Sequence, residues 1–139
     1  MELQPYLFFA GNCEEALQFY QRSIGAEVTY LLRYKDSPEP HSDPIPEEWQ
    51  NKVMHANVRI GESQFMASDG KCDDNYPDFN GFSLTLHADS RKDAERLFKS
   101  LASGGRVTQP FQATFWSSGF GMVLDRFGVS WMIMSDIDG

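Results

Sequence analysis

The stretch LQPYLFFAGNCEEALQFYQRSIG, residues 3–25, decides the fold. Its first part, residues 3–9, alternates loosely and is rich in aromatic side chains, which predicts a β-strand. The segment Cys13–Ile24 carries apolar residues at helical spacing, and Gly25 stands where a glycine commonly ends a helix. Asn12, with a glutamate three residues later, has the spacing of a helix N-cap. The chain is therefore expected to open with a strand and a helix.

The same order returns in the second half of the chain. A shift of 79 residues places Leu7 on Leu86, Phe19 on Phe98 and Gly25 on Gly104. Further strands are expected over residues 26–34, 53–60, 63–68, 81–88, 106–113, 120–125 and 129–134, and a second helix from Asp89 or Ser90 to about residue 103.

Each half thus consists of a strand, a helix and three strands. This pattern predicts an α+β fold of two βαβββ modules that form cupped mixed β-sheets. We expect a single domain over residues 1–139 with internal modules at about 1–70 and 78–139. The proline-rich segment 35–50 between two expected strands is predicted to be a long loop.

Charge and composition exclude several classes of partner. The chain has 12 Lys and Arg against 20 Asp and Glu, a net charge of −8, so nucleic acid and anionic membranes are not expected to bind. No apolar run is long enough to span a bilayer, and the first residues lack a signal-peptide pattern. Cys13 and Cys72 follow no metal or redox spacing. We therefore expect a cytoplasmic protein with reduced thiols.

Three stretches resemble a known superfamily over nearly the whole chain. They are PYLFF, GNC and ALQFY at 5–9, 11–13 and 16–20; HANVRIG at 55–61; and TFW, GFG and DRFGVSWMI at 114–116, 119–121 and 125–133. The duplication and these motifs resemble the vicinal oxygen chelate superfamily, which includes glyoxalase I, extradiol dioxygenases, and fosfomycin and bleomycin resistance proteins. More narrowly, the chain is similar to the PhnB-like branch, which is often labelled as a ubiquinone-pathway methyltransferase.

The resemblance also implies where a metal would bind. It places the four metal-ligand positions of glyoxalase I at Pro5, Met66, a window over 82–84, and Met132. Transition-metal enzymes of this kind need nitrogen or oxygen donors at such positions, and only the neighbouring Gln4 could ligate weakly. We therefore expect neither the superfamily's metal nor any other cofactor.

A small polar group marks the candidate site. His55, Asn57 and Arg59 share one face of an expected strand whose other face is apolar, so they are predicted to face a cleft and orient a ligand. The alternative is a structural set, bonded to neighbouring strands or to a second subunit. The aromatic pair Phe115 and Trp116 is expected to wall a pocket or, alternatively, to cover a loop or contact a subunit.

The ligand-binding residues that we predict are His55, Asn57, Arg59, Met66, Phe115, Trp116 and Met132, and His55 is the best candidate for a catalytic residue. Three classes of function remain open: a metal-independent small-molecule binding protein, an enzyme acting on a small substrate through His55 or a non-standard metal site, and an interaction module. Methyl transfer is disfavoured because no glycine-rich strand-to-helix loop is found. A homodimer is expected, since cupped sheets leave edges and apolar rims that need cover.

Overall fold

The computed structural model describes residues 1–38, 44–70 and 78–138 of the chain. Chain contacts divide it into two compact units, Met1–Pro77 (unit 1) and Asp78–Gly139 (unit 2). Cys72 and the middle of the proline-rich segment, residues 39–43, lie outside the described residues.

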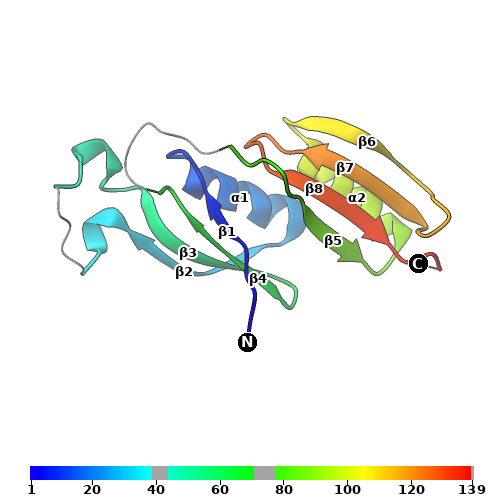
Figure 1. Ribbon diagram of the computed structural model, residues 1–139, viewed down its shortest axis with the longest axis horizontal. Coiled ribbons are helices and arrows are strands. Elements are labelled where there is room, and N and C mark those ends of the chain that lie inside the picture. Colours follow the sequence, from blue (N-terminus) through cyan, green and yellow to red (C-terminus); the bar gives the residue numbers. More distant parts are fainter. Residues whose placement is uncertain (39–43, 71–77, 139) are drawn as a thin grey trace. The chain divides into compact units, whose positions relative to one another are not determined.

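Unit 1 contains a four-stranded mixed sheet and one helix (Figure 1). Its elements are β1 (Tyr6–Phe8), α1 (Cys13–Ile24), β2 (Glu27–Arg33), β3 (Val53–Ile60) and β4 (Ser63–Ser68). The strand order is β1-β4-β3-β2, with β1 parallel to β4 and the other pairs antiparallel. Two short 3₁₀ turns, Tyr34–Asp36 and Glu47–Trp49, belong to the proline-rich connection.

Unit 2 repeats this topology. Its elements are β5 (Leu84–Ala88), α2 (Arg91–Ala102), β6 (Arg106–Gln112), β7 (Gly119–Leu124) and β8 (Ser130–Ser135), in the order β5-β8-β7-β6. The strand β5 is again parallel to β8, and the other pairs are antiparallel. The predicted fold of two βαβββ modules is thereby confirmed.

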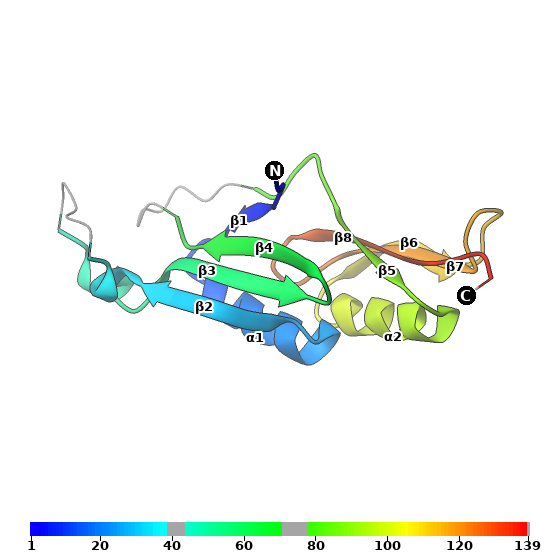
Figure 2. The same ribbon diagram turned by 90° about the horizontal axis from the view of Figure 1, so that it is seen from below.

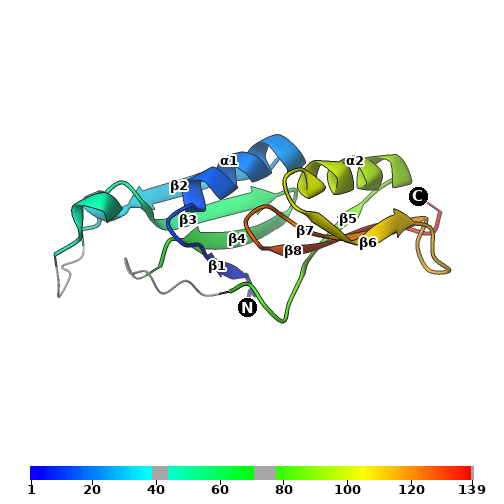
Figure 3. The same ribbon diagram turned by 90° about the horizontal axis from the view of Figure 1, so that it is seen from above.

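Each helix covers one face of its own sheet (Figures 2 and 3). In unit 1, Ala16, Leu17 and Tyr20 of α1 are fully buried, and the Tyr20 ring meets Phe65 of β4 edge-on at 6.4 Å. In unit 2, Trp131 and Ile133 are buried on the side that faces α2, and Trp131 is the core residue expected from its alternation with the methionines. The opposite face of each sheet carries no helix from the described residues of its own unit, and we call it the open face.

The helix N-termini are capped in two different ways. Ser90 accepts a hydrogen bond from the Asp93 backbone N–H, as a cap should. Asn12 makes no such bond to α1; its side-chain oxygen accepts from the Ala10 N–H instead, so the expected Asn12 cap is wrong. The carboxylate of Asp69, at the end of β4, accepts from the Cys13 N–H in its place.

The first strands of both modules are shorter than predicted. The strand β1 spans Tyr6–Phe8 rather than 3–9, and β5 spans Leu84–Ala88 rather than 81–88. Both are edge strands, so only one neighbour holds them, and Pro5 has no N–H to extend the ladder. Only the Pro5 carbonyl takes part, accepting a hydrogen bond from the Met66 N–H at 2.9 Å.

Candidate functional site

The alternation of β3 places the predicted polar residues on the open face of unit 1. Ala56 and Val58 are buried on the helix side, while His55 and Asn57 are half-buried and Arg59 is exposed on the other side. Met66 joins them, because it pairs with Asn57 across the β3–β4 ladder and with Tyr6 across the β1–β4 ladder. Four of the seven predicted binding residues therefore share one surface.

His55 is held by two hydrogen bonds from opposite sides of its ring. Its Nε2 lies 2.8 Å from the Asn57 side-chain oxygen Oδ1, and its Nδ1 lies 2.8 Å from the Tyr6 hydroxyl. A carbonyl oxygen only accepts, so Nε2 carries the proton. In the neutral ring Nδ1 is then an acceptor, and the Tyr6 hydroxyl donates to it. Both ring nitrogens are thus bonded to protein, but the ring remains partly accessible.

Aromatic rings flank this array. Tyr6 and Phe8 on β1 stack with ring centroids 4.6 Å apart and planes 5° from parallel. His55 meets Tyr6 edge-on at 5.5 Å, and the Tyr30 ring of β2 lies 6.2 Å from His55. The residues Tyr6, Phe8 and Tyr30 are 37%, 43% and 49% exposed, so the open face offers flat apolar surface beside its polar groups.

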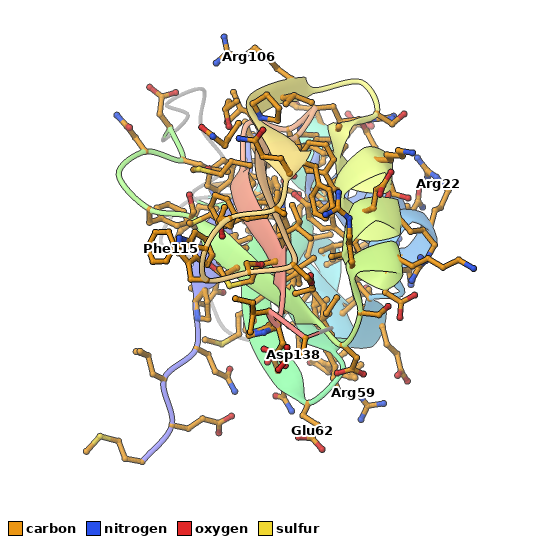
Figure 4. All side chains as sticks on the ribbon, turned by 90° about the vertical axis from the view of Figure 1, so that its right-hand side faces the viewer. Arg22, Arg59, Glu62, Arg106, Phe115 and Asp138 are labelled. Atoms are coloured by element: carbon orange, nitrogen blue, oxygen red, sulfur yellow. The ribbon has the colours of Figure 1, made fainter. Side chains whose placement is uncertain are left out.

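The charge of Arg59 is neutralised by a neighbour. Its guanidinium lies 2.5 Å from the Glu27 carboxylate on β2, and both side chains are well exposed. Figure 4 shows Arg59 near the turn that carries Glu62. Partial burial raises the pKa of the Tyr6 phenol, an effect that a hydrogen bond with the Ser68 side chain opposes, so Tyr6 is neutral at pH 7. The array therefore carries no unpaired ionised group.

The equivalent face of unit 2 has a different chemistry. Met122 pairs with Met132 as Asn57 pairs with Met66, so the residues that replace His55, Asn57 and Arg59 are Phe120, Met122 and Leu124. Met134 and Phe120 are paired in the same ladder. On β7 and β8 the open face of unit 2 is thus lined by thioethers and apolar side chains, among them predicted residue Met132, while Thr85 and His87 of β5 are the strand partners of Met132 and Met134.

The remaining two predicted residues lie in the connection between β6 and β7. Phe115 is 89% exposed and projects from the ribbon (Figure 4), while Trp116 is 44% exposed and packs edge-on to Phe120 at 4.8 Å. Ser117 anchors the turn beneath them, since its buried hydroxyl is hydrogen-bonded to the carbonyls of Gly119 and Ser135. Phe115 and Trp116 therefore belong to unit 2, whereas the His55 array belongs to unit 1.

The strand registers identify which side chains face the two expected methionine positions. Tyr6 is the partner of Met66 and Thr85 is the partner of Met132, in place of Pro5 and the 82–84 window that the resemblance implied. The side chains at these positions are a phenol, a hydroxyl and two thioethers. No cluster of three or more His, Cys, Asp or Glu residues suited to a metal occurs in the part of the chain that the structure describes.

Tyr6, Phe8 and Tyr30 are the members of the site that sequence reasoning missed. The sequence does carry a pattern that places Tyr6 and Phe8 on the open face, because both alternate with the buried Leu7 on β1. Tyr30 could not be placed, because β2 has a register shift between Val28 and Tyr30 that breaks its alternation.

Comparison with known proteins gives a consistent family. The family model described as 3-demethylubiquinone-9 3-methyltransferase matches residues 1–134. Protein YjdN of Escherichia coli K12 is 41% identical over 143 residues, which cover 96% of this chain and 94% of that protein.

Solved structures are similar as well. Protein PA1353 from Pseudomonas aeruginosa is 42% identical with a TM-score of 0.85 over 98% of both chains. The PhnB protein from Bacillus cereus is 26% identical with a TM-score of 0.77, over 97% of this chain and 99% of that one. A glyoxylase/bleomycin resistance protein/dioxygenase domain from Frankia, 14% identical with a TM-score of 0.66, shares the fold over 98% of this chain and 97% of that one. No helix among the described residues is long and apolar enough to cross a membrane.

Proposed function

The chain belongs to the PhnB-like family with the glyoxalase and bleomycin-resistance fold, and from that premise we propose that it is a metal-independent small-molecule binding protein. The ligand site is the open face of unit 1. The observation that carries the proposal is the Tyr6–His55–Asn57 array, a set of oriented polar groups flanked by partly exposed aromatic rings. Flat apolar surface with a few fixed polar groups is the usual composition of a ligand site.

We propose that this function needs no metal because the side chains at the relevant positions are poor metal ligands. Tyr6, Met66, Thr85 and Met132 occupy the open-face positions of the outer parallel strand pairs. Thioethers are soft ligands and do not hold zinc, manganese or iron(II) in an open catalytic site. His55 does not compensate, because the nitrogen that could ligate is already bonded to Tyr6.

Methyl transfer, which the family description names, finds no support in the described geometry. The connection from β5 to α2 caps its helix through Ser90, and the connection from β1 to α1 is held by Asp69, the residue after β4, which accepts from the Gly11 and Cys13 N–H groups. A methyl-donor site usually needs a glycine-rich strand-to-helix loop against a parallel sheet, whereas both sheets here are mixed.

A second candidate is an acid–base enzyme on the same surface. In the tautomer in which His55 Nδ1 accepts a hydrogen bond from the Tyr6 hydroxyl, a substrate proton could pass to the Tyr6 oxygen as the hydroxyl proton moves to His55, while Asn57 keeps the ring oriented. This candidate predicts that the protein exchanges the acidic C–H protons of a bound ketone with solvent, and that His55→Ala abolishes the exchange. A binding protein shows no such exchange.

A chemical-shift map tests the proposed site. Uniformly ¹⁵N-labelled protein in EDTA is titrated with a set of planar aromatic fragments. We expect the amide signals of β1, β3 and the central part of β4 to shift, and those of β2 near Tyr30. Shifts confined to unit 2, or shifts that occur only after a transition metal is added, would overturn the proposal.

A further inference from the structure

The hydrogen bonds of Tyr6 determine what a ligand must bring to it. Its only proton is donated to His55 Nδ1, so towards any other group the Tyr6 oxygen can only accept. The Ser68 side chain, whose hydroxyl accepts from the Gly70 N–H, also lies close enough to the Tyr6 oxygen to lower its pKa. A second lone pair of the Tyr6 oxygen stays available. A ligand group that reaches this oxygen must therefore be a donor.

Asn57, in contrast, offers a hydrogen-bond donor to a ligand. Its side-chain oxygen faces the His55 Nε2, and its amide nitrogen has no hydrogen-bond partner within the described part of the chain. That nitrogen carries two protons. Because Asn57 is half-buried, a ligand that reaches its nitrogen gains most if it presents an acceptor there.

The acceptor on Tyr6 and the donor on Asn57 belong to groups bonded to opposite sides of the His55 ring. Tyr6 and Asn57 bind different nitrogens of His55, so the width of the imidazole and two hydrogen bonds separate them. A donor and an acceptor on adjacent ligand atoms could not reach both. A ligand that does so needs its donor and its acceptor at opposite ends of a ring.

Charge and shape narrow the ligand class further. Arg59 is paired with Glu27, and Tyr6 is neutral, so the array offers no ionised partner to an ionic group. The exposed rings of Tyr6, Phe8 and Tyr30 favour a flat aromatic ligand. We propose that the site selects a neutral para-hydroxyaryl carbonyl compound, whose hydroxyl donates to Tyr6 and whose carbonyl accepts from Asn57. This inference rests on the proposed function.

Three matched compounds test the inference at pH 7 in EDTA. The probe is 4-hydroxyacetophenone, 4-methoxyacetophenone lacks the donor, and 4-ethylphenol lacks the acceptor. Dissociation constants are measured from the shifts of the β1 and β3 amides. We expect 4-hydroxyacetophenone to bind about tenfold more tightly than either analogue, since each analogue leaves one polar group of the site unpaired.

Two variants test whether the Tyr6 hydroxyl, and not merely an aromatic ring, recognises the hydroxyl of the ligand. Tyr6→Phe removes the acceptor and should bring 4-hydroxyacetophenone and 4-methoxyacetophenone to within about twofold of each other. Tyr30→Phe is the matched control, because the Tyr30 hydroxyl has no hydrogen-bond partner in the described residues, and it should keep the tenfold preference. Equal binding of all three compounds to wild type would overturn the inference and leave the proposed function standing. If none of the three compounds shifts the amide signals of this face while other planar fragments do, the inference alone is overturned. If no fragment shifts these signals, both the inference and the proposed function are overturned.

Discussion

The Tyr6 hydroxyl oxygen lies 2.8 Å from Nδ1 of His55, although the two residues are 49 positions apart in the chain. The contact exists because the parallel β1–β4 pair and the antiparallel β3–β4 pair bring Tyr6 and Asn57 to the same residue, Met66. The β4 strand therefore lies between β1, which carries Tyr6, and β3, which carries His55 and Asn57, and pairs with both. The candidate site depends on this register, since a slip of one residue would turn every one of these side chains to the helix side.

Replacing His55 separates a binding role from a structural one. His55→Ala should weaken binding of 4-hydroxyacetophenone by roughly 1–3 kcal/mol, because Tyr6 and Asn57 lose the group that orients them. The free energy of unfolding should fall by no more than about 1 kcal/mol, since the ring is only half-buried on the open face. Urea unfolding and ligand titration of the same variant supply both values. A large loss of stability with unchanged binding would assign His55 to the structural set.

Asp69 is expected to be a structural residue of unit 1. Its carboxylate accepts from the backbone N–H groups of Gly11, Cys13 and Val53, each at 2.9 Å, and it is 4% exposed. Asp69→Ala would leave these donors without their acceptor and should lower the free energy of unfolding by roughly 2–5 kcal/mol.

The acid that follows β8 provides the control for Asp69. The Asp136 side chain bonds only to His87 among the hydrogen bonds of the described chain, and it is 71% exposed. Asp136→Ala should therefore change stability by less than about 0.5 kcal/mol. If chemical unfolding gave comparable losses of unfolding free energy for Asp69→Ala and Asp136→Ala, the buried Asp69 carboxylate would not be what stabilises the N-terminus of α1.

The Glu14–Arg33 pair should give a measurable acid dependence. Both terminal guanidinium nitrogens of Arg33, Nη1 and Nη2, donate to the Glu14 carboxylate, at 3.1 and 2.7 Å, and the hydrogen bond to Arg33 lowers the pKa of Glu14 below its usual 4.5. A lowered pKa in the folded state stabilises the protein above the unfolded value, and that contribution disappears as the pH falls through the folded value.

We therefore expect wild type to be more stable than Glu14→Gln at neutral pH, by less than about 1 kcal/mol because the pair is partly exposed. The difference should shrink as the pH falls below 4.5 and vanish once the pH is below the lowered folded-state pKa of Glu14. Unfolding curves across this range measure it. A difference that stays constant with pH would mean that the charge of Glu14 contributes nothing.

The exposed elements of unit 2 favour association with a second copy. The strand β6 lies at a sheet edge with almost every residue exposed, and Phe115 is 89% exposed beside Trp116. Such edges and aromatic side chains are usually covered. We predict a homodimer of about twice the 15.8 kDa chain mass, measured by sedimentation at micromolar concentration. A sedimenting monomer would contradict this expectation.

The repeated strand–helix pattern was enough to predict the fold. The alternation of residues 53–60 also predicts that His55, Asn57 and Arg59 share one face of the strand, as they do. These successes share a cause, since periodicity records which side of an element is buried.

What the sequence could not show is pairing between strands. Tyr6 becomes a partner of His55 only through the β1–β4–β3 register, and no local pattern reports a contact over 49 residues. The same limit explains the failed Asn12 cap: the acceptor that α1 uses comes from Asp69, far along the chain. The shift between Val28 and Tyr30 similarly hid the third ring of the site.

Metal-independent binding on the open face of unit 1 is the central claim, and calorimetric titration tests it most directly. Protein dialysed against EDTA and then brought to stoichiometric zinc, nickel, manganese or iron(II) is titrated with 4-hydroxyacetophenone, with metal content measured on each sample. The claim predicts one dissociation constant for all samples and less than about 0.1 equivalent of retained metal after dialysis. Binding that requires a stoichiometric metal ion would contradict it.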